Sequence, residues 1–153
     1  MTTHARAGMT THTRDGWFYG LGLAGLANLA NGFWMLADPK LWYTELPAAV
    51  PDFGPFNEHF VRDIGGVFLT FGIALLWAAA RPALRFPLVA VTALFFGFHA
   101  AFHVYDTARG FVDATHWWID FPGVYLPALV LAGAALWLAR ARTPAPRLER
   151  SRP

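Results

Sequence analysis

The chain has 153 residues, of which 56% are hydrophobic and 14% are charged. Soluble globular domains carry about 25% charged residues, so this composition argues against a soluble domain and favours an integral membrane protein. The length suits a single domain, and the absence of cysteine excludes disulfides, thiolate metal sites and cysteine nucleophiles.

The first sixteen residues form a polar N-terminal tail (1–16) without an apolar segment ahead of Trp17. A cleavable signal needs such a segment soon after a short basic start, so we expect the first hydrophobic span to be kept as a membrane anchor.

Four segments carry the roughly 20 apolar residues that a helix needs to cross a bilayer. Because the backbone must satisfy its own hydrogen bonds in lipid, we predict that all four are helices. The expected fold is an all-α integral membrane four-helix bundle. The predicted helices cover about 17–37, 60–80, 86–105 and 119–139.

Two further regions differ in composition from the predicted helices. The loop 38–59 is rich in proline, glycine and aromatic residues, so we interpret it either as an interfacial anchor or as a lid over a site. The segment 140–153 is rich in proline and arginine, and we expect a basic, disordered C-terminal tail.

Charge is distributed unequally between the two ends of the predicted bundle. The tails and the turn between the second and third helices hold nine basic and two acidic residues, whereas the opposite end holds three basic and eight acidic residues. Since Lys and Arg mark the cytoplasmic side, we expect a multi-pass protein of the cytoplasmic (inner) membrane with both termini in the cytoplasm. Basic residues used for orientation and lipid contact leave no separate nucleic-acid surface.

Polar residues recur at helical spacing on the predicted helices. On the third helix, Thr92, His99, His103 and Asp106 lie on one face. The corresponding sets on the other helices are Gly25, Asn28 and Gly32 with Asn31 at the edge, His59, Asp63, Gly66 and Thr70, and His116, Asp120, Gly123 and Pro127. Because lipid offers polar groups no partner, we expect these stripes to face the bundle axis, with His and Asp at its outer mouth.

Imidazoles and carboxylates from several helices are suitable ligands for zinc, copper or iron, and two histidines from different helices can hold haem b. We therefore hypothesise a metal or haem site, with a redox role following from the bound group. The candidate ligands or orienting groups are His59, His99, His103, His116, Asp63, Asp106 and Asp120. Arg62, Asn28 and Asn31 are candidates for substrate binding or counter-charge.

Other interpretations of the same residues stay open. His–Asp hydrogen bonds also hold helices together without any ligand, which fits a non-enzymatic accessory or scaffold subunit with a partner membrane or redox protein, or a homo-oligomer. A small proton-coupled transporter is a third hypothesis. It needs polar residues that continue to the inner end, and below Thr70 and Thr92 the stripes become apolar.

The motifs "NGFWMLADPKLWY", "FNEHFVRDIGG" and "HAAFHVYD" resemble those of small four-helix bacterial membrane proteins that are loosely DoxX-like. The resemblance covers roughly Gly20 to Trp137 and implies a four-helix membrane bundle without a defined activity. The strong preference for arginine, with Lys40 the single lysine, is typical of GC-rich bacterial genomes.

Overall fold

The computed structural model describes residues 15–142, and this part of the chain is all-helical with no β-strand. The predicted tails, 1–16 and 140–153, lie largely outside the described residues. The elements are α1 (Gly16–Ala37), α2 (Pro39–Glu45), the 3₁₀ helix η1 (Val50–Phe53), α3 (Glu58–Ala80), the 3₁₀ turn η2 (Pro82–Leu84), α4 (Arg85–Ala108), α5 (His116–Ile119), the π-helical turn η3 (Phe121–Tyr125) and α6 (Leu126–Arg142).

Side chains that cap the free backbone N–H groups define where the first three α-helices begin. The carboxylate of Asp15 accepts a hydrogen bond from the N–H of Phe18, and the Asn57 side chain does the same for α3. Asp38 ends α1 and caps α2, whose first residue is Pro39, a position that needs no N–H donor.

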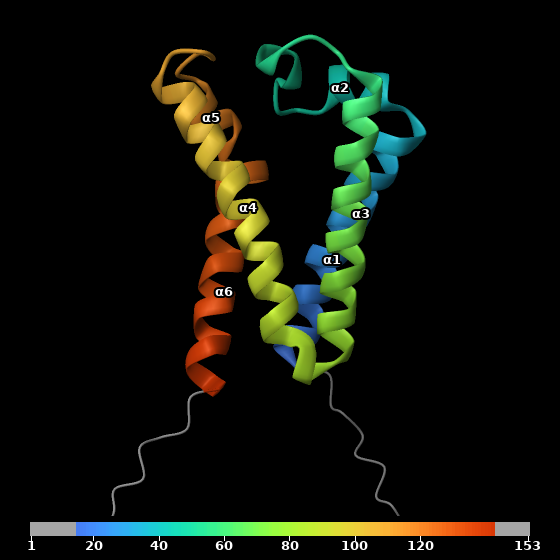
Figure 1. Ribbon diagram of the computed structural model, residues 1–153, viewed down its shortest axis with the longest axis vertical. Coiled ribbons are helices and arrows are strands. Elements are labelled where there is room, and N and C mark those ends of the chain that lie inside the picture. Colours follow the sequence, from blue (N-terminus) through green and yellow to red (C-terminus); the bar gives the residue numbers. More distant parts are fainter. Residues whose placement is uncertain (1–14, 143–153) are drawn as a thin grey trace, which may run out of the picture.

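The four long helices form two antiparallel pairs, α1 with α3 and α4 with α6 (Figure 1). The pairs meet at the end of the molecule where the described termini lie and separate toward the end that carries α2 and α5 (Figure 1). At the closed end, the guanidinium of Arg85 at the start of α4 donates to both carboxylate oxygens of Asp15, at 2.6 and 2.8 Å. This ion pair joins the beginning of one helix pair to the beginning of the other.

Glycine brings α1 and α3 into close contact. A β-carbon on Gly32 would lie 2.7 Å from the carbonyl oxygen of Gly65, and one on Gly25 would lie 2.9 Å from that of Gly72. Such backbone contact through small residues is typical of helix pairs in membranes. The face of α3 that meets α1 is therefore defined by Gly65 and Gly72, which turns the His59 stripe away from this contact.

The fourth predicted helix, 119–139, is not continuous. A π-helical turn, η3, separates α5 from α6, and Asp120 lies at the junction. Pro127 has no N–H, so the regular bond to the carbonyl of Gly123 cannot form, and π-helical turns occur where such bonds are interrupted. The interruption leaves His116 and Asp120 on a separate short element above α6.

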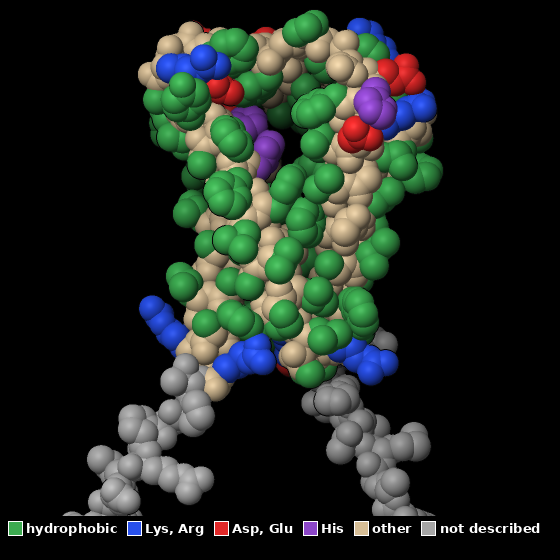
Figure 2. Space-filling view, viewed as in Figure 1, with side chains coloured by type: hydrophobic (Ala, Val, Ile, Leu, Met, Phe, Trp, Pro, Cys, Tyr) green, Lys and Arg blue, Asp and Glu red, His purple; other side chains and the backbone are tan. Residues whose placement is uncertain are grey.

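Within the described part of the chain, three helical segments are long and apolar enough to cross a membrane: Glu58–Ala80, Pro82–Ala108 and Phe121–Arg142. Many large hydrophobic side chains on them point outward, among them Phe98, Phe102 and Leu129, each about two-thirds exposed. Figure 2 shows hydrophobic side chains over the waist of the molecule, with charged side chains concentrated at its two ends. This surface is suited to a lipid environment.

Candidate functional site

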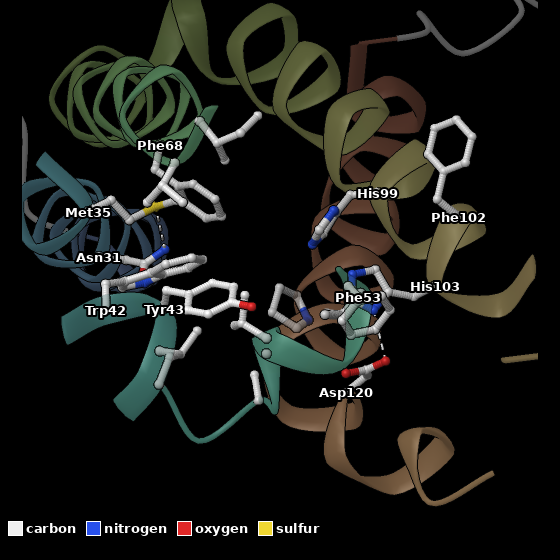
Figure 3. Close-up of a pocket in the computed structure, with 18 of the residues that line it drawn as sticks. Asn31, Met35, Trp42, Tyr43, Phe53, Phe68, His99, Phe102, His103 and Asp120 are labelled. Carbon is white, nitrogen blue, oxygen red and sulfur yellow. Dashed lines mark hydrogen bonds and ion pairs between the residues drawn. The ribbon is translucent and has the colours of Figure 1, made fainter. Parts of the chain in front are cut away.

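A cavity of about 1080 Å³ lies between the two helix pairs where they separate. Apolar and aromatic side chains make up most of its wall (Figure 3), including Met35, Trp42, Phe53, Phe68, Phe95 and Phe96. The space-filling view shows a hollow at this level with histidine side chains at its edge (Figure 2). Cavities of this size and character are typical of small-molecule sites.

His99 and His103 of α4 supply imidazole rings to one wall of the cavity (Figure 3). The two rings are one helical turn apart, with centroids separated by 4.6 Å, and His99 stacks in parallel on Phe95. His103 Nδ1 lies 2.8 Å from Asp120 Oδ2. This contact fixes the orientation of the His103 ring, as a carboxylate does beside many functional imidazoles.

Asp120 and His116 form a buried network behind His103. The other oxygen of Asp120, Oδ1, lies 3.3 Å from His116 Nδ1, and His116 Nε2 lies 3.2 Å from Asp52 Oδ2. His116 is completely buried, and burial lowers the pKa of this imidazole. The hydrogen bonds and charges of Asp52 and Asp120 outweigh burial, so the pKa of His116 is raised above its ordinary value of 6.5.

The loop between α2 and α3 lies over this network. The Phe53 ring packs against His103 and His116, with centroid distances of 4.6 and 4.9 Å. The Tyr43 hydroxyl donates to the carbonyl of Gly54 at 2.7 Å, which ties the loop to α2. Of the two interpretations of the loop, these contacts favour a lid over a site.

The opposite wall of the cavity contains Asn28 and Asn31 of α1. Asn31 accepts a hydrogen bond from the indole N–H of Trp42 at 2.9 Å. The Asn28 amide donates to the carbonyl of Ala24, whereas its buried oxygen has no hydrogen-bond partner among residues 15–142. A buried acceptor without a donor costs about 1–3 kcal/mol, so this oxygen is a position where a ligand donor would be stabilised.

The structure does not bring His59 and Asp63 to this site. They pair with each other at 3.4 Å on the outside of α3, and their side chains are 89% and 63% exposed. The expected convergence of all four stripes is wrong for α3, because its glycine face packs on α1. Arg62 is likewise exposed and pairs with Glu58 at 3.0 Å.

Asp106 lies at the edge of the cavity but does not join the network of Asp120. Its carboxylate accepts from the guanidinium of Arg109 at 2.9 Å, three residues later on the same helix. Its geometry therefore supports a local ion pair near the end of α4.

Metal and haem ligation receive little support from these positions. Within residues 15–142, no group of three or more His, Asp or Glu side chains is arranged to hold a metal ion. Both ring nitrogens of His116 and one of His103 are already engaged by carboxylates. His99 and His103 lie on the same helix, so they cannot ligate opposite faces of one haem.

Sequence reasoning missed Asp52, Phe53 and Trp42 as parts of the site. All three lie in the segment 38–59, where no helical period relates them to the stripes. The available signal was the combination of buried-type aromatics with an acidic residue in a proline-rich loop, "PDFGPF".

Comparisons with protein-family models, with curated proteins and with solved structures find no match to this chain. The DoxX-like resemblance therefore stays an expectation, and function has to be inferred from the geometry of the cavity.

Proposed function

We propose that this chain is a multi-pass membrane protein that binds an amphipathic small molecule in the cavity between its two helix pairs. The polar part of the ligand contacts His99 and His103, and the apolar part lies among the phenylalanines. The observation that carries this proposal is a cavity of about 1080 Å³ whose wall is mostly apolar and whose polar groups are few.

The distribution of polar groups supports a ligand with one polar end. The imidazoles of His99 and His103 lie near Asp120, whereas Phe68, Phe95 and Phe96 form an apolar region of the wall. A purely apolar ligand would offer no hydrogen-bond partner to the His99 imidazole or to the Asn28 oxygen, at a cost in free energy. A fully polar ligand would lose its hydration against the aromatic rings.

The surroundings support entry from lipid. The helices that enclose the cavity include the three apolar segments, and their outer surfaces carry exposed aromatic and aliphatic side chains. An amphipathic molecule that is dissolved in the membrane reaches such a cavity without passing through water.

Four membrane crossings with both termini in the cytoplasm remain part of the proposal. What supports the fourth crossing is the antiparallel packing of α1 on α3, with Gly25 opposite Gly72 and Gly32 opposite Gly65. These two glycine contacts keep α1 beside α3 over much of its helix. α1 therefore lies at the same depth as α3, which is long and apolar enough to cross the membrane.

Metal binding is a weaker candidate, favoured by one observation. Asp120 contacts Nδ1 of His103, as carboxylates commonly do for histidines whose other nitrogen binds a metal, and His99 lies one turn away. Any remaining ligands would come from water or from the bound molecule. Metal analysis of the purified protein tests this idea, because stoichiometric zinc, copper or iron should disappear in the double variant His99→Ala, His103→Ala.

The binding proposal is tested by native mass spectrometry of the protein released from detergent or nanodiscs, followed by extraction and identification of the bound compound. We expect one amphipathic molecule per chain in the natural protein. His99→Phe fills part of the cavity and removes a polar contact, so occupancy should fall by about tenfold or more, since a lost buried hydrogen bond costs about 1–3 kcal/mol.

The matched control is His59→Phe, the same substitution on the exposed face of α3, which should retain the compound. Equal amounts of bound molecule in the two variants, or bulk lipid alone in the natural protein, would contradict the proposal.

A further inference from the structure

We propose a proton relay between the cavity and the water at the end of the molecule that carries α2 and α5. The relay consists of Asp52, His116, Asp120 and His103. The inference deepens the proposed function and rests on it for its purpose, because it assigns acid–base chemistry to the polar end of the ligand site. The chemical class of ligand is then an amphipathic molecule whose polar group gains or loses a proton.

The geometry of the relay is an unbroken series of three short contacts. Asp52 Oδ2 lies 3.2 Å from His116 Nε2, His116 Nδ1 lies 3.3 Å from Asp120 Oδ1, and Asp120 Oδ2 lies 2.8 Å from His103 Nδ1. The four residues come from η1, α5, the junction before η3, and α4. Each inner residue uses a different atom for each neighbour, as a chain of proton transfers requires.

Burial distinguishes the ends of the series from its middle. The Asp52 side chain is 55% exposed, the side chains of His116 and Asp120 are inaccessible, and His103 lines the cavity. Phe53 packs against both imidazoles. A proton that moves between the outer surface and His103 along this line therefore moves through side chains.

Each imidazole in the series can accept a proton on one nitrogen and release one from the other, whereas each carboxylate accepts and releases the same proton. When the cavity ligand gives a proton to His103 Nε2, His103 releases its Nδ1 proton to Asp120. Rotation of the neutral Asp120 carboxyl group brings this proton from the His103 side to the His116 side. His116, present as its Nε2–H tautomer, accepts the proton on Nδ1 and releases its Nε2 proton through Asp52 to water. One proton enters and one leaves, no electrons are transferred, and the reverse sequence supplies a proton to the ligand.

The inner half of the molecule shows why the relay serves the cavity and does not conduct across the membrane. From His99 toward the closed end, the next residues on the same face of α4 are Phe96, Thr92 and Val89, and all three are buried. The Thr92 hydroxyl donates to the carbonyl of Leu88 at 2.8 Å. Among the described residues, the line of titratable groups ends at the cavity wall.

The relay is tested by NMR on protein with ¹⁵N-labelled histidine in nanodiscs, without added ligand. The measured quantity is the rate at which the ring N–H of His103 exchanges with water. His116→Gln and Asp52→Asn keep hydrogen-bonding groups of similar size but cannot carry a proton, so each should slow exchange by roughly tenfold or more. His59→Gln, at an exposed histidine outside the series, should leave the rate unchanged.

Exchange at the natural rate in both relay variants would overturn the proposal, because the proton would then reach His103 through cavity water. Absence of exchange in the natural protein would overturn it as well, because the network would be static. If His116→Gln does not fold, Asp52→Asn at the exposed end decides alone. If no ligand co-purifies with the protein, the binding proposal is contradicted, but the exchange rate of the His103 ring N–H can still be measured and still tests the relay.

Discussion

His116 is a completely buried imidazole that contacts two carboxylates, one from the loop and one from the junction before α6. An imidazolium in this position is neutralised on both sides, which is why its pKa is raised in spite of burial. His103 contacts the far oxygen of Asp120, and the charge of His116 also acts on Asp113 in the preceding loop. Protonated His116 therefore holds η1 against α5.

This geometry predicts a pH-dependent attachment of the loop. Because the folded-state pKa of His116 lies above 6.5, its stabilising contribution is complete below pH 6.5 and is lost as the pH rises through the folded-state value. Amide hydrogen exchange in Val50–Phe53, corrected for the intrinsic effect of pH, should therefore accelerate above pH 6.5. In Asp52→Asn this dependence should weaken, and an equally steep dependence in that variant would show that another group is responsible.

Sequence patterns predicted individual side chains well only where a regular helix carries them. The period of α4 placed His99 and His103 on one face, and both line the cavity. The same reasoning was wrong about which way His59 and Asp63 face. Helical spacing shows that residues share a face, but the identity of the inward face depends on which side packs more closely, and on α3 that side is the glycine side.

At the scale of the element, the contact between α1 and α3 depends on glycine. The ideal β-carbon of an alanine at position 32 would lie 2.7 Å from the Gly65 carbonyl oxygen and 2.9 Å from the Leu69 backbone nitrogen. Both neighbours are backbone atoms of a packed helix, so relief requires the two helices to move apart.

Gly32→Ala should accordingly destabilise the protein by about 1–3 kcal/mol, the range found for overpacked interiors. Gly22→Ala is the matched control on the same helix, since no atom lies within 4 Å of its added β-carbon. That variant should be neutral or slightly stabilising because alanine favours helix. Unfolding in mixed detergent measures both, and equal stability of the two variants would show that α1 and α3 are not held in this register.

Elements formed by local pattern could be predicted, whereas their interruptions were harder to recognise. Hydrophobic length identified all four long helical regions. The π-helical turn at Phe121–Tyr125 escaped detection because Pro122 is compatible with a first helical turn and only Pro127 signals a bend. The loop residues Asp52 and Phe53 escaped detection for a different reason, because contacts with residues distant in the sequence position them.

At the scale of the whole molecule, two helix pairs joined at one end and separated at the other make the cavity possible (Figure 1). The Asp15–Arg85 ion pair and the apolar core around Leu75, Val89 and Leu131 hold the closed end. The expected single bundle axis with four converging stripes is thus replaced by a gap between pairs. Sequence stripes could not reveal this, because the distance between helix pairs depends on side-chain volume along both of them.

The arrangement also predicts how the protein lies in the membrane. The described termini and Arg85 lie at the closed end, and the acidic residues Asp52, Asp106 and Asp113 lie in or next to the loops of the open end. Since cytoplasmic loops are enriched in Lys and Arg, the closed end should face the cytoplasm. The three apolar segments and α1, packed antiparallel on α3, would then give four crossings.

Single-cysteine labelling tests this topology on a chain that has no cysteine of its own and therefore no background. In intact spheroplasts, a membrane-impermeant maleimide should label Thr44→Cys in the exposed part of α2. Gly16→Cys and Arg140→Cys should react only after permeabilisation, because they lie at the closed end. If Gly16→Cys and Thr44→Cys are both labelled in intact spheroplasts, α1 does not cross the membrane. If Arg140→Cys is labelled and Thr44→Cys is not, the mouth of the cavity faces the cytoplasm.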